Sequence, residues 1–251
     1  MTLADIEYRT IITTRIAATS YEHASQQVIA WAHDKTPCFV SAANVHVVME
    51  ACDNTQFTAA LKKADLITPD GVPLVWALKM LGVKNATRVY GPDLTLSVCE
   101  AAENESVPIA LYGSTPDILA DFVSFLNRRY PALNVACSIS PPFRRLSDEE
   151  DAQYVKQLND SGARILFVGL GCPKQELWIA DHLDKINMVM LAVGVAFDFH
   201  AGATLQAPRW IMRLGLEWLF RLMVEPKRLW KRYVRHNPRF VWKFMKQWLR
   251  A

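Results

Sequence analysis

Residues 165–176 read ILFVGLGCPKQE, an apolar run that leads into a loop with two glycines and a proline. The run is apolar at every position instead of every second one, which predicts a strand that is buried on both faces. Pro173 is suited to the first turn of a helix. The stretch therefore predicts a buried strand, a tight loop and a helix, the repeating unit of a parallel sheet.

The same unit recurs from about residue 37 to residue 200. Short β-branched or apolar runs predict strands at 38–41, 66–68, 109–112, 135–138, 165–169 and 189–194. Helical periodicity predicts intervening helices at 45–52, 55–63, 74–81, 94–103, 116–130 and 148–160, the last opened by a Ser147–Glu150 capping box. This alternation predicts an α/β fold with a Rossmann-like, mostly parallel, doubly wound sheet.

The composition is that of a folded chain. The 251 residues are 51% hydrophobic and 10% aromatic with a net charge of +3, which excludes disorder as the main state. The longest apolar run, 188–197, is too short to cross a bilayer, and the first residues show no secretory signal pattern. Five scattered cysteines without a C-x-x-C pair predict neither a disulfide framework nor a zinc site, and favour the cytoplasm.

Charge is distributed unevenly along the chain. Residues 1–202 contain 16 Lys and Arg against 23 Asp and Glu, whereas 203–251 contain 12 against 2, with five of the eight tryptophans. We therefore expect an α/β domain over 1–202 and a basic, Trp-rich helical appendage over 203–251, divided into three short helices by Pro208, Pro226 and Pro238. Basic charge among tryptophans suits an anionic membrane surface or nucleic acid, and the appendage alone leaves both open.

Ligands of such sheets lie beyond the carboxyl ends of the strands, so the residues that follow each strand are the site candidates. Asp70 stands between Pro69 and Gly71, where it is suited either to accepting a proton from a bound hydroxyl or to forming a turn. Asp198 ends an apolar run, so its carboxylate needs a partner, a function or a capping role.

Two further loops carry polar residues at the same predicted edge. Asn44 is suited either to capping the N-terminus of a helix or to binding a ligand. His46 is suited either to packing within the protein or to binding a ligand. The loop around Gly171 suits an anion at a helix N-terminus or a plain tight turn, but it has neither a dinucleotide fingerprint nor a Walker spacing. No residue set has metal-ligand spacing, and no G-x-S-x-G elbow is present.

Taken in order, these segments resemble the WecG/TagA/CpsF glycosyltransferase family over roughly residues 37–235. The matching stretches are 44–46, 64–71, 88–94, 169–176, 194–199, 206–210, 215–221 and 225–228. The resemblance implies a metal-independent, cofactor-free, inverting transfer of a sugar from a UDP-sugar to a polyprenyl-diphosphate-linked saccharide in cell-surface polysaccharide synthesis. It also implies a peripheral enzyme on the anionic inner face of the cell membrane, transferring N-acetylmannosamine, its uronic acid or glucose.

The resemblance also implies residue roles. Asp70 corresponds to the catalytic base, Gln175 to the donor pocket, and Arg221 and Arg228 to the residues that bind the diphosphate. The other positions expected to bind donor or substrate are Asn44, His46, Arg88, Asp93, Gly171, Lys174, Asp198 and Lys231. Ala42 replaces a threonine of many members, so a hydroxyl contact is lost or taken over by Ser41, and the donor sugar stays open.

Charge balance supports the arginine assignment. Breaking a sugar–diphosphate bond leaves negative charge that, without a metal motif, helix N-termini and cations have to meet. The acidic body lacks them, so we expect the appendage to supply Arg221 and Arg228, together with Lys231 and Arg232.

Two other functional classes account for part of the sequence. A nucleic-acid-binding protein would use the basic tail but leaves Asp70 unexplained, and the resemblance implies no nucleic-acid partner. A nicotinamide-dependent oxidoreductase lacks its glycine fingerprint. Apolar surface on the appendage is also compatible with a homo-oligomer.

Overall fold

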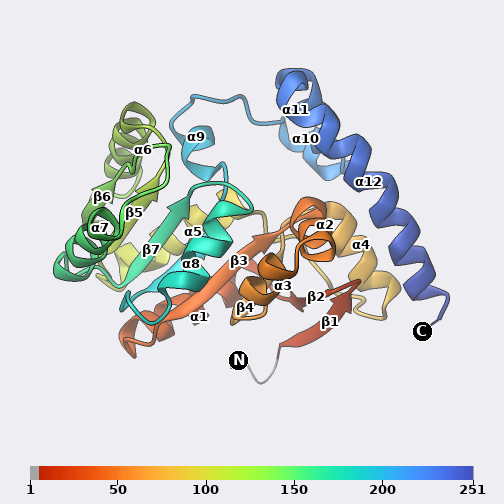
Figure 1. Cartoon of the computed structure of the whole chain (residues 1–251), viewed down its shortest axis with the longest axis horizontal. Coiled ribbons are helices and arrows are strands. Elements are labelled where there is room, and N and C mark those ends of the chain that lie inside the picture. Colours follow the sequence, from red (N-terminus) through yellow and green to blue (C-terminus); the bar gives the residue numbers. More distant parts are fainter. Residues whose placement is uncertain (1–5, 251) are drawn as a thin grey trace.

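A six-stranded parallel sheet forms the centre of the computed structural model, which describes residues 6–250 (Figure 1). Its strand order is β4-β3-β8-β7-β5-β6, and every neighbouring pair is parallel. The strands are β3 (Cys38–Ala43), β4 (Leu66–Pro69), β5 (Ile109–Gly113), β6 (Val135–Ile139), β7 (Ile165–Gly169) and β8 (Val189–Ala192). All six predicted strands are therefore confirmed, with β8 ending at Ala192 instead of Gly194.

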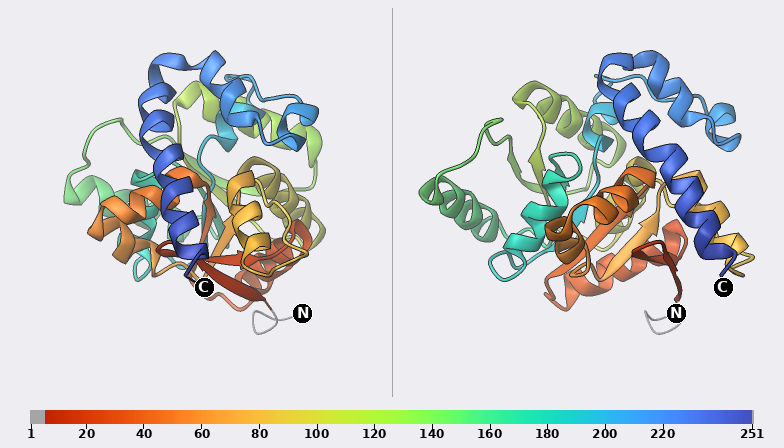
Figure 2. Two further views of the ribbon diagram at one scale, coloured as in Figure 1. Left: turned by 90° about the vertical axis from the view of Figure 1, so that its right-hand side faces the viewer. Right: turned by 45° about the vertical axis from the view of Figure 1, so that its right-hand side comes forward.

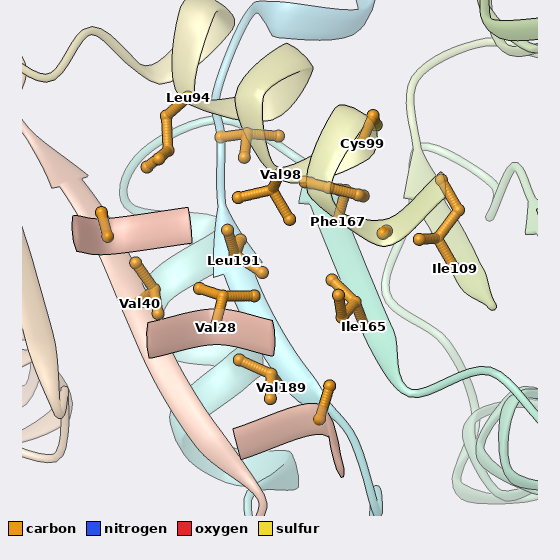
Figure 3. Close-up of a cluster of buried hydrophobic side chains, with 14 of the residues drawn as sticks. Val28, Val40, Leu94, Val98, Cys99, Ile109, Ile165, Phe167, Val189 and Leu191 are labelled. Atoms are coloured by element: carbon orange, nitrogen blue, oxygen red, sulfur yellow. The ribbon is translucent and has the colours of Figure 1, made fainter. Parts of the chain in front are cut away.

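Helices cover both faces of this sheet, which confirms the doubly wound architecture. They are α2 (Val45–Asp53), α3 (Thr55–Leu61), α4 (Val72–Met80), α5 (Gly91–Asn104), α6 (Pro116–Arg129), α7 (Asp148–Asp160), α8 (Lys174–His182) and α9 (Ala196–His200). On one face, Val28 of α1 (Tyr21–His33) and Val98 of α5 pack on Val40, Phe167 and Leu191 of the sheet (Figure 3). On the other face, α7 and α8 contribute buried side chains to a second cluster.

The fold begins earlier in the chain than the sequence analysis predicts. A two-stranded antiparallel hairpin, β1 (Glu7–Ile11) and β2 (Thr14–Ala18), precedes α1. Its tight turn places Ile12 at a positive φ of 59°, a conformation that β-branched residues rarely adopt. The sequence around Ile12 contains no glycine or asparagine that would predict this turn. The helix α1 does carry a signal, because the Ser20 side chain accepts a hydrogen bond from the His23 amide.

The basic appendage consists of α10 (Arg209–Arg213), α11 (Glu217–Val224) and α12 (Pro226–Trp248). The predicted helix break at Pro238 is wrong, since α12 continues through it. Buried side chains hold α12 on both sides of the proline, His236 before it and Phe240 and Phe244 after it. We attribute the continuous helix to this packing, which offsets the hydrogen bond that a proline removes.

The helix α12 lies along the body and ends at the hairpin (Figure 2). Arg239 pairs with Asp53 of α2 at 2.7 Å, and Gln247 accepts a hydrogen bond from the Ile12 amide at 2.7 Å. Between residues 6 and 250, no helix combines the length and the apolarity that crossing a membrane requires. The appendage is thus attached along its length to the domain whose strand ends carry the site candidates.

Candidate active site

A cavity of about 560 Å³ opens at the carboxyl ends of the parallel strands. Residues after β3, β4, β5, β7 and β8 form one part of its wall, and residues of α11 and α12 form the other. Its volume lies in the range of small-molecule sites. Of the predicted site residues, those that line it are Asn44, His46, Asp70, Arg88, Gly171, Gln175, Asp198, Arg221 and Arg228.

Asp70 lies in the cavity wall directly after β4, with 14% of its side chain exposed. One carboxylate oxygen, Oδ1, accepts a hydrogen bond from the Gly91 amide at 3.1 Å, and Oδ2 accepts one from Asn44 Nδ2 at 3.3 Å. Burial raises the pKa of Asp70 to about 6; the Glu217 carboxylate adds to the rise and the Arg88 guanidinium opposes it. A carboxyl group with this pKa is suited to accepting a proton near neutral pH.

Arg88 connects this carboxylate to the appendage. Its Nε donates to the backbone carbonyl of Asp70, and its guanidinium lies 3.8 Å from Asp70 Oδ1. The same guanidinium pairs at 2.5 Å with Glu217 of α11, whose side chain is only 12% exposed. The docking of α11 therefore affects the electrostatic environment of Asp70 directly.

Asn44 caps a helix, as the sequence predicts, and also contacts Asp70 in the cavity wall. Its Oδ1 accepts hydrogen bonds from the His46 and Val47 amides, which caps α2, while its Nδ2 donates to Asp70. His46 follows on the first turn of α2 and lines the cavity. Burial, with a contribution from Arg232, lowers the pKa of His46 to about 3, so its ring is neutral at physiological pH.

The loop after β7 is tied to the loop after β8 by Gln175, which is 3% exposed. Its Oε1 accepts hydrogen bonds from the amides of Gly171 and Gly194, each at 3.1 Å. Its Nε2 donates to Glu176 at 3.0 Å, and burial raises the pKa of Glu176 to about 7. Gln175 therefore lines the cavity and also fixes the position of two of its loops.

The appendage brings cations to the opposite wall. Arg221 of α11 and Arg228 of α12 share Glu225, at 3.6 Å and 2.7 Å respectively. Asp198, after β8, lines the cavity on the side of the strand ends; burial raises its pKa, and the Arg228 guanidinium opposes the rise. Arg232 also lines the cavity.

Three of the predicted residues lie outside the lining. Asp93 pairs with Arg209 at 2.5 Å, which fastens the start of α10 to α5. Lys174 is exposed at the start of α8, and the Lys231 ammonium lies 5.7 Å from the centre of the Trp230 ring. Helical geometry explains why Lys231 does not line the cavity. It is next to Arg232 in sequence but points to a different side of α12.

Glu217 and His236 are among the lining residues that have no role in the sequence analysis. Both come from the appendage, and only the docked position of the appendage brings them to the strand ends. His236 lies beside His46, with ring centres 5.2 Å apart. His46, Glu50 and His236 form a group of possible metal ligands whose ligand atoms lie within 4.8 Å of one another, although their sequence spacing gives no sign of it.

Comparisons with known proteins show which proteins this chain is similar to. The model of the glycosyl transferase WecG/TagA/CpsF family matches residues 9–251. A protein of Bacillus spizizenii (strain W23), named N-acetylglucosaminyldiphosphoundecaprenol N-acetyl-beta-D-mannosaminyltransferase, is 28% identical over 204 residues, 81% of this chain and 77% of the relative. A protein of the same name from Bacillus subtilis (strain 168) is 28% identical over 202 residues, 79% of this chain and 75% of the relative.

Proposed function

Because the chain belongs to the WecG/TagA/CpsF family of glycosyl transferases, we propose that it moves a sugar from a UDP-sugar to a saccharide on polyprenyl diphosphate, with inversion and without a metal. The relatives support a lipid-linked acceptor, since their names describe an N-acetylmannosaminyl transfer to N-acetylglucosaminyl-diphosphoundecaprenol. The observation that carries the proposal is the cavity that Asp70 lines together with Arg221 and Arg228 of the appendage.

Asp70 is the base of this reaction. Its carboxylate takes the proton from the acceptor hydroxyl as that oxygen attacks the anomeric carbon from the side opposite the nucleotide. The new glycosidic bond forms as the bond to the diphosphate breaks, and the nucleotide diphosphate leaves as an anion that needs no proton. One carboxyl group is therefore sufficient, and the hydrogen bonds from Gly91 and Asn44 keep it oriented.

The leaving diphosphate develops negative charge, and Arg221 and Arg228 are the groups that stabilise it. Both line the cavity, and both come from the part of the chain with 12 basic and 2 acidic residues. Cations fixed in advance near developing charge lower the barrier without reorganising during the reaction. This arrangement supports a transfer in which guanidinium groups neutralise the leaving group.

The pH dependence of the reaction follows from the environment of Asp70. Because the base acts when deprotonated, we expect kcat/KM to fall as the pH decreases through about 6. Glu217→Gln removes a negative charge that raises the pKa of Asp70, so the acid limb of the profile moves to lower pH. The measurement is a pH profile of kcat/KM for both proteins.

A matched control is Glu22→Gln on the exposed side of α1, which leaves the profile where it is in the unmodified protein. An acid limb that stays in place in Glu217→Gln, or that moves to higher pH, contradicts the role given to Asp70.

We also propose that the appendage docks on the anionic inner face of the cell membrane. Exposed apolar side chains occur on all three of its helices and at the end of α10, namely Trp210, Leu214, Met223, Trp230, Val234, Val241 and Trp242. Two of the tryptophans have a lysine over the ring, Lys231 by Trp230 and Lys246 by Trp242. Indole rings next to ammonium groups are suited to the interface between headgroups and acyl chains.

The double substitution Trp230→Ser with Trp242→Ser therefore weakens binding to vesicles that contain anionic lipid. Partial burial of two indoles corresponds to a loss of about tenfold or more in affinity. Phe143→Ser in the loop between β6 and α7, which is 77% exposed and outside the appendage, is the control. Co-sedimentation at increasing salt measures both, and binding that neither falls in the double variant nor weakens with salt contradicts the proposal.

The catalytic proposal is tested with a panel of UDP-sugars and a polyprenyl-diphosphate-linked N-acetylglucosamine. We expect UDP release that depends on the acceptor, and an inverted anomeric centre in the product. The sequence leaves the donor sugar open at Ala42, so the panel of UDP-sugars identifies it. If no UDP-sugar is consumed, while oligonucleotides and not UDP raise the melting temperature, the nucleic-acid alternative replaces this one.

A further inference from the structure

Arg232 differs from the other cavity arginines in having no acidic partner. Arg88 pairs with Glu217, and Arg221 and Arg228 share Glu225. Within residues 6–250, no carboxylate lies within salt-bridge distance of Arg232, and its buried Nε has no hydrogen-bond partner. A partly buried guanidinium without a counter-charge is unfavourable unless a ligand supplies one.

Two histidines beside Arg232 also have unused polar atoms. His236 follows Arg232 by one helical turn on α12, so both project from the same side of the helix. Its ring lies 5.2 Å from that of His46, and both line the cavity. The Nδ1 atoms of both rings are buried without a hydrogen-bond partner, and His236 is only 6% exposed.

The charge around these rings favours an anion over a metal ion. Arg232 disfavours the protonated form of His46, and the same repulsion acts on a divalent cation between the two rings. Glu50 is the only carboxylate in the group of possible metal ligands. Its single negative charge is opposed by the positive charge of the Arg232 guanidinium. An anion, in contrast, gives Arg232 its missing counter-charge and can accept a hydrogen bond from a ring N–H of either histidine.

We propose that Arg232, His46 and His236 form a phosphate-binding subsite that takes a diphosphate group, next to the one formed by Arg221 and Arg228. The inference rests on the proposed function, in which both substrates carry a diphosphate. Arg232 lies one helical turn beyond Arg228, so the diphosphate comes either from the nucleotide or from the prenyl-linked acceptor.

The test is calorimetric binding of inorganic pyrophosphate to the full chain. Arg232→Gln weakens this binding by about 10- to 100-fold, the range expected for a lost charge-assisted hydrogen bond, and Arg232→Lys restores part of it. Lys246→Gln is the matched control, because Lys246 is exposed on the same helix and does not line the cavity. Its pyrophosphate affinity stays within about twofold of the unmodified protein.

Parallel titrations with UDP and with farnesyl diphosphate identify the source of the diphosphate, since the ligand that Arg232→Gln weakens more is the one bound there. Equal losses in Arg232→Gln and Lys246→Gln, or no loss in either, overturn the subsite. Stabilisation of the unmodified protein by Zn²⁺ alone, without binding of pyrophosphate, also overturns it in favour of a metal site. Because pyrophosphate binding needs no turnover, a chain that transfers no sugar but binds pyrophosphate through Arg232 contradicts only the proposed function.

Discussion

Asp70→Asn lowers the turnover number by about 10²- to 10⁴-fold, the contribution of a general base. Asparagine has nearly the same shape as aspartate but cannot take a proton from the acceptor hydroxyl. Its amide retains an acceptor oxygen for the hydrogen bond from Gly91 or from Asn44. The substitution therefore removes the chemical function of the side chain while keeping its place in the wall.

The measurement is steady-state kinetics with saturating UDP-sugar and acceptor, together with UDP affinity from calorimetry. We expect the UDP affinity to stay within a few fold, because Asp70 acts on the acceptor and not on the nucleotide. A turnover number within about tenfold of the unmodified protein means that another group is the base.

Arg221→Gln is the second substitution with a large expected effect, a fall in the turnover number of about 10²- to 10³-fold. Arg221 is 15% exposed and lies over the Phe199 ring, with 5.5 Å between its guanidinium carbon and the ring centre. A guanidinium held in this way is in position before the diphosphate charge develops. Glutamine keeps part of the packing and loses the charge.

Arg213→Gln at the end of α10 is the control, since Arg213 is exposed, belongs to the same appendage and does not line the cavity. We expect its turnover to match that of the unmodified protein. Equal activities for Arg221→Gln and the unmodified enzyme would remove Arg221 from the site and leave it with a packing role on Phe199.

The sheet was predictable because each strand is a continuous apolar run between helical segments. β7 has the predicted bounds, and the Ser147 capping box opens α7 at the predicted residue. The hairpin was not predictable in the same way, because its turn uses Ile12 at positive φ without glycine or asparagine. Pro238 misled the prediction because packing of α12 on α2 outweighs the local preference of proline.

The site residues also fall into those that the local sequence predicts and those that only tertiary packing brings to the cavity. Asp70, Asn44 and Gln175 follow strands, and the rule for parallel sheets brings strand ends together without further information. Glu217 and His236 reach the cavity only because α11 and α12 fold back over it, a tertiary contact that leaves no local pattern. Charge composition did identify the appendage as the source of cations, but not which of its cations face inward.

The central claim is that a pocket at the ends of an acidic domain's strands is completed by arginines from the C-terminal helices. A crystal structure of the full chain with UDP bound tests it most directly. We predict diphosphate oxygens within hydrogen-bond distance of the Arg221 and Arg228 guanidinium groups, with Asp70 facing the open side of the β-phosphate. Arginines turned into solvent, with a divalent ion neutralising the diphosphate, would contradict the account.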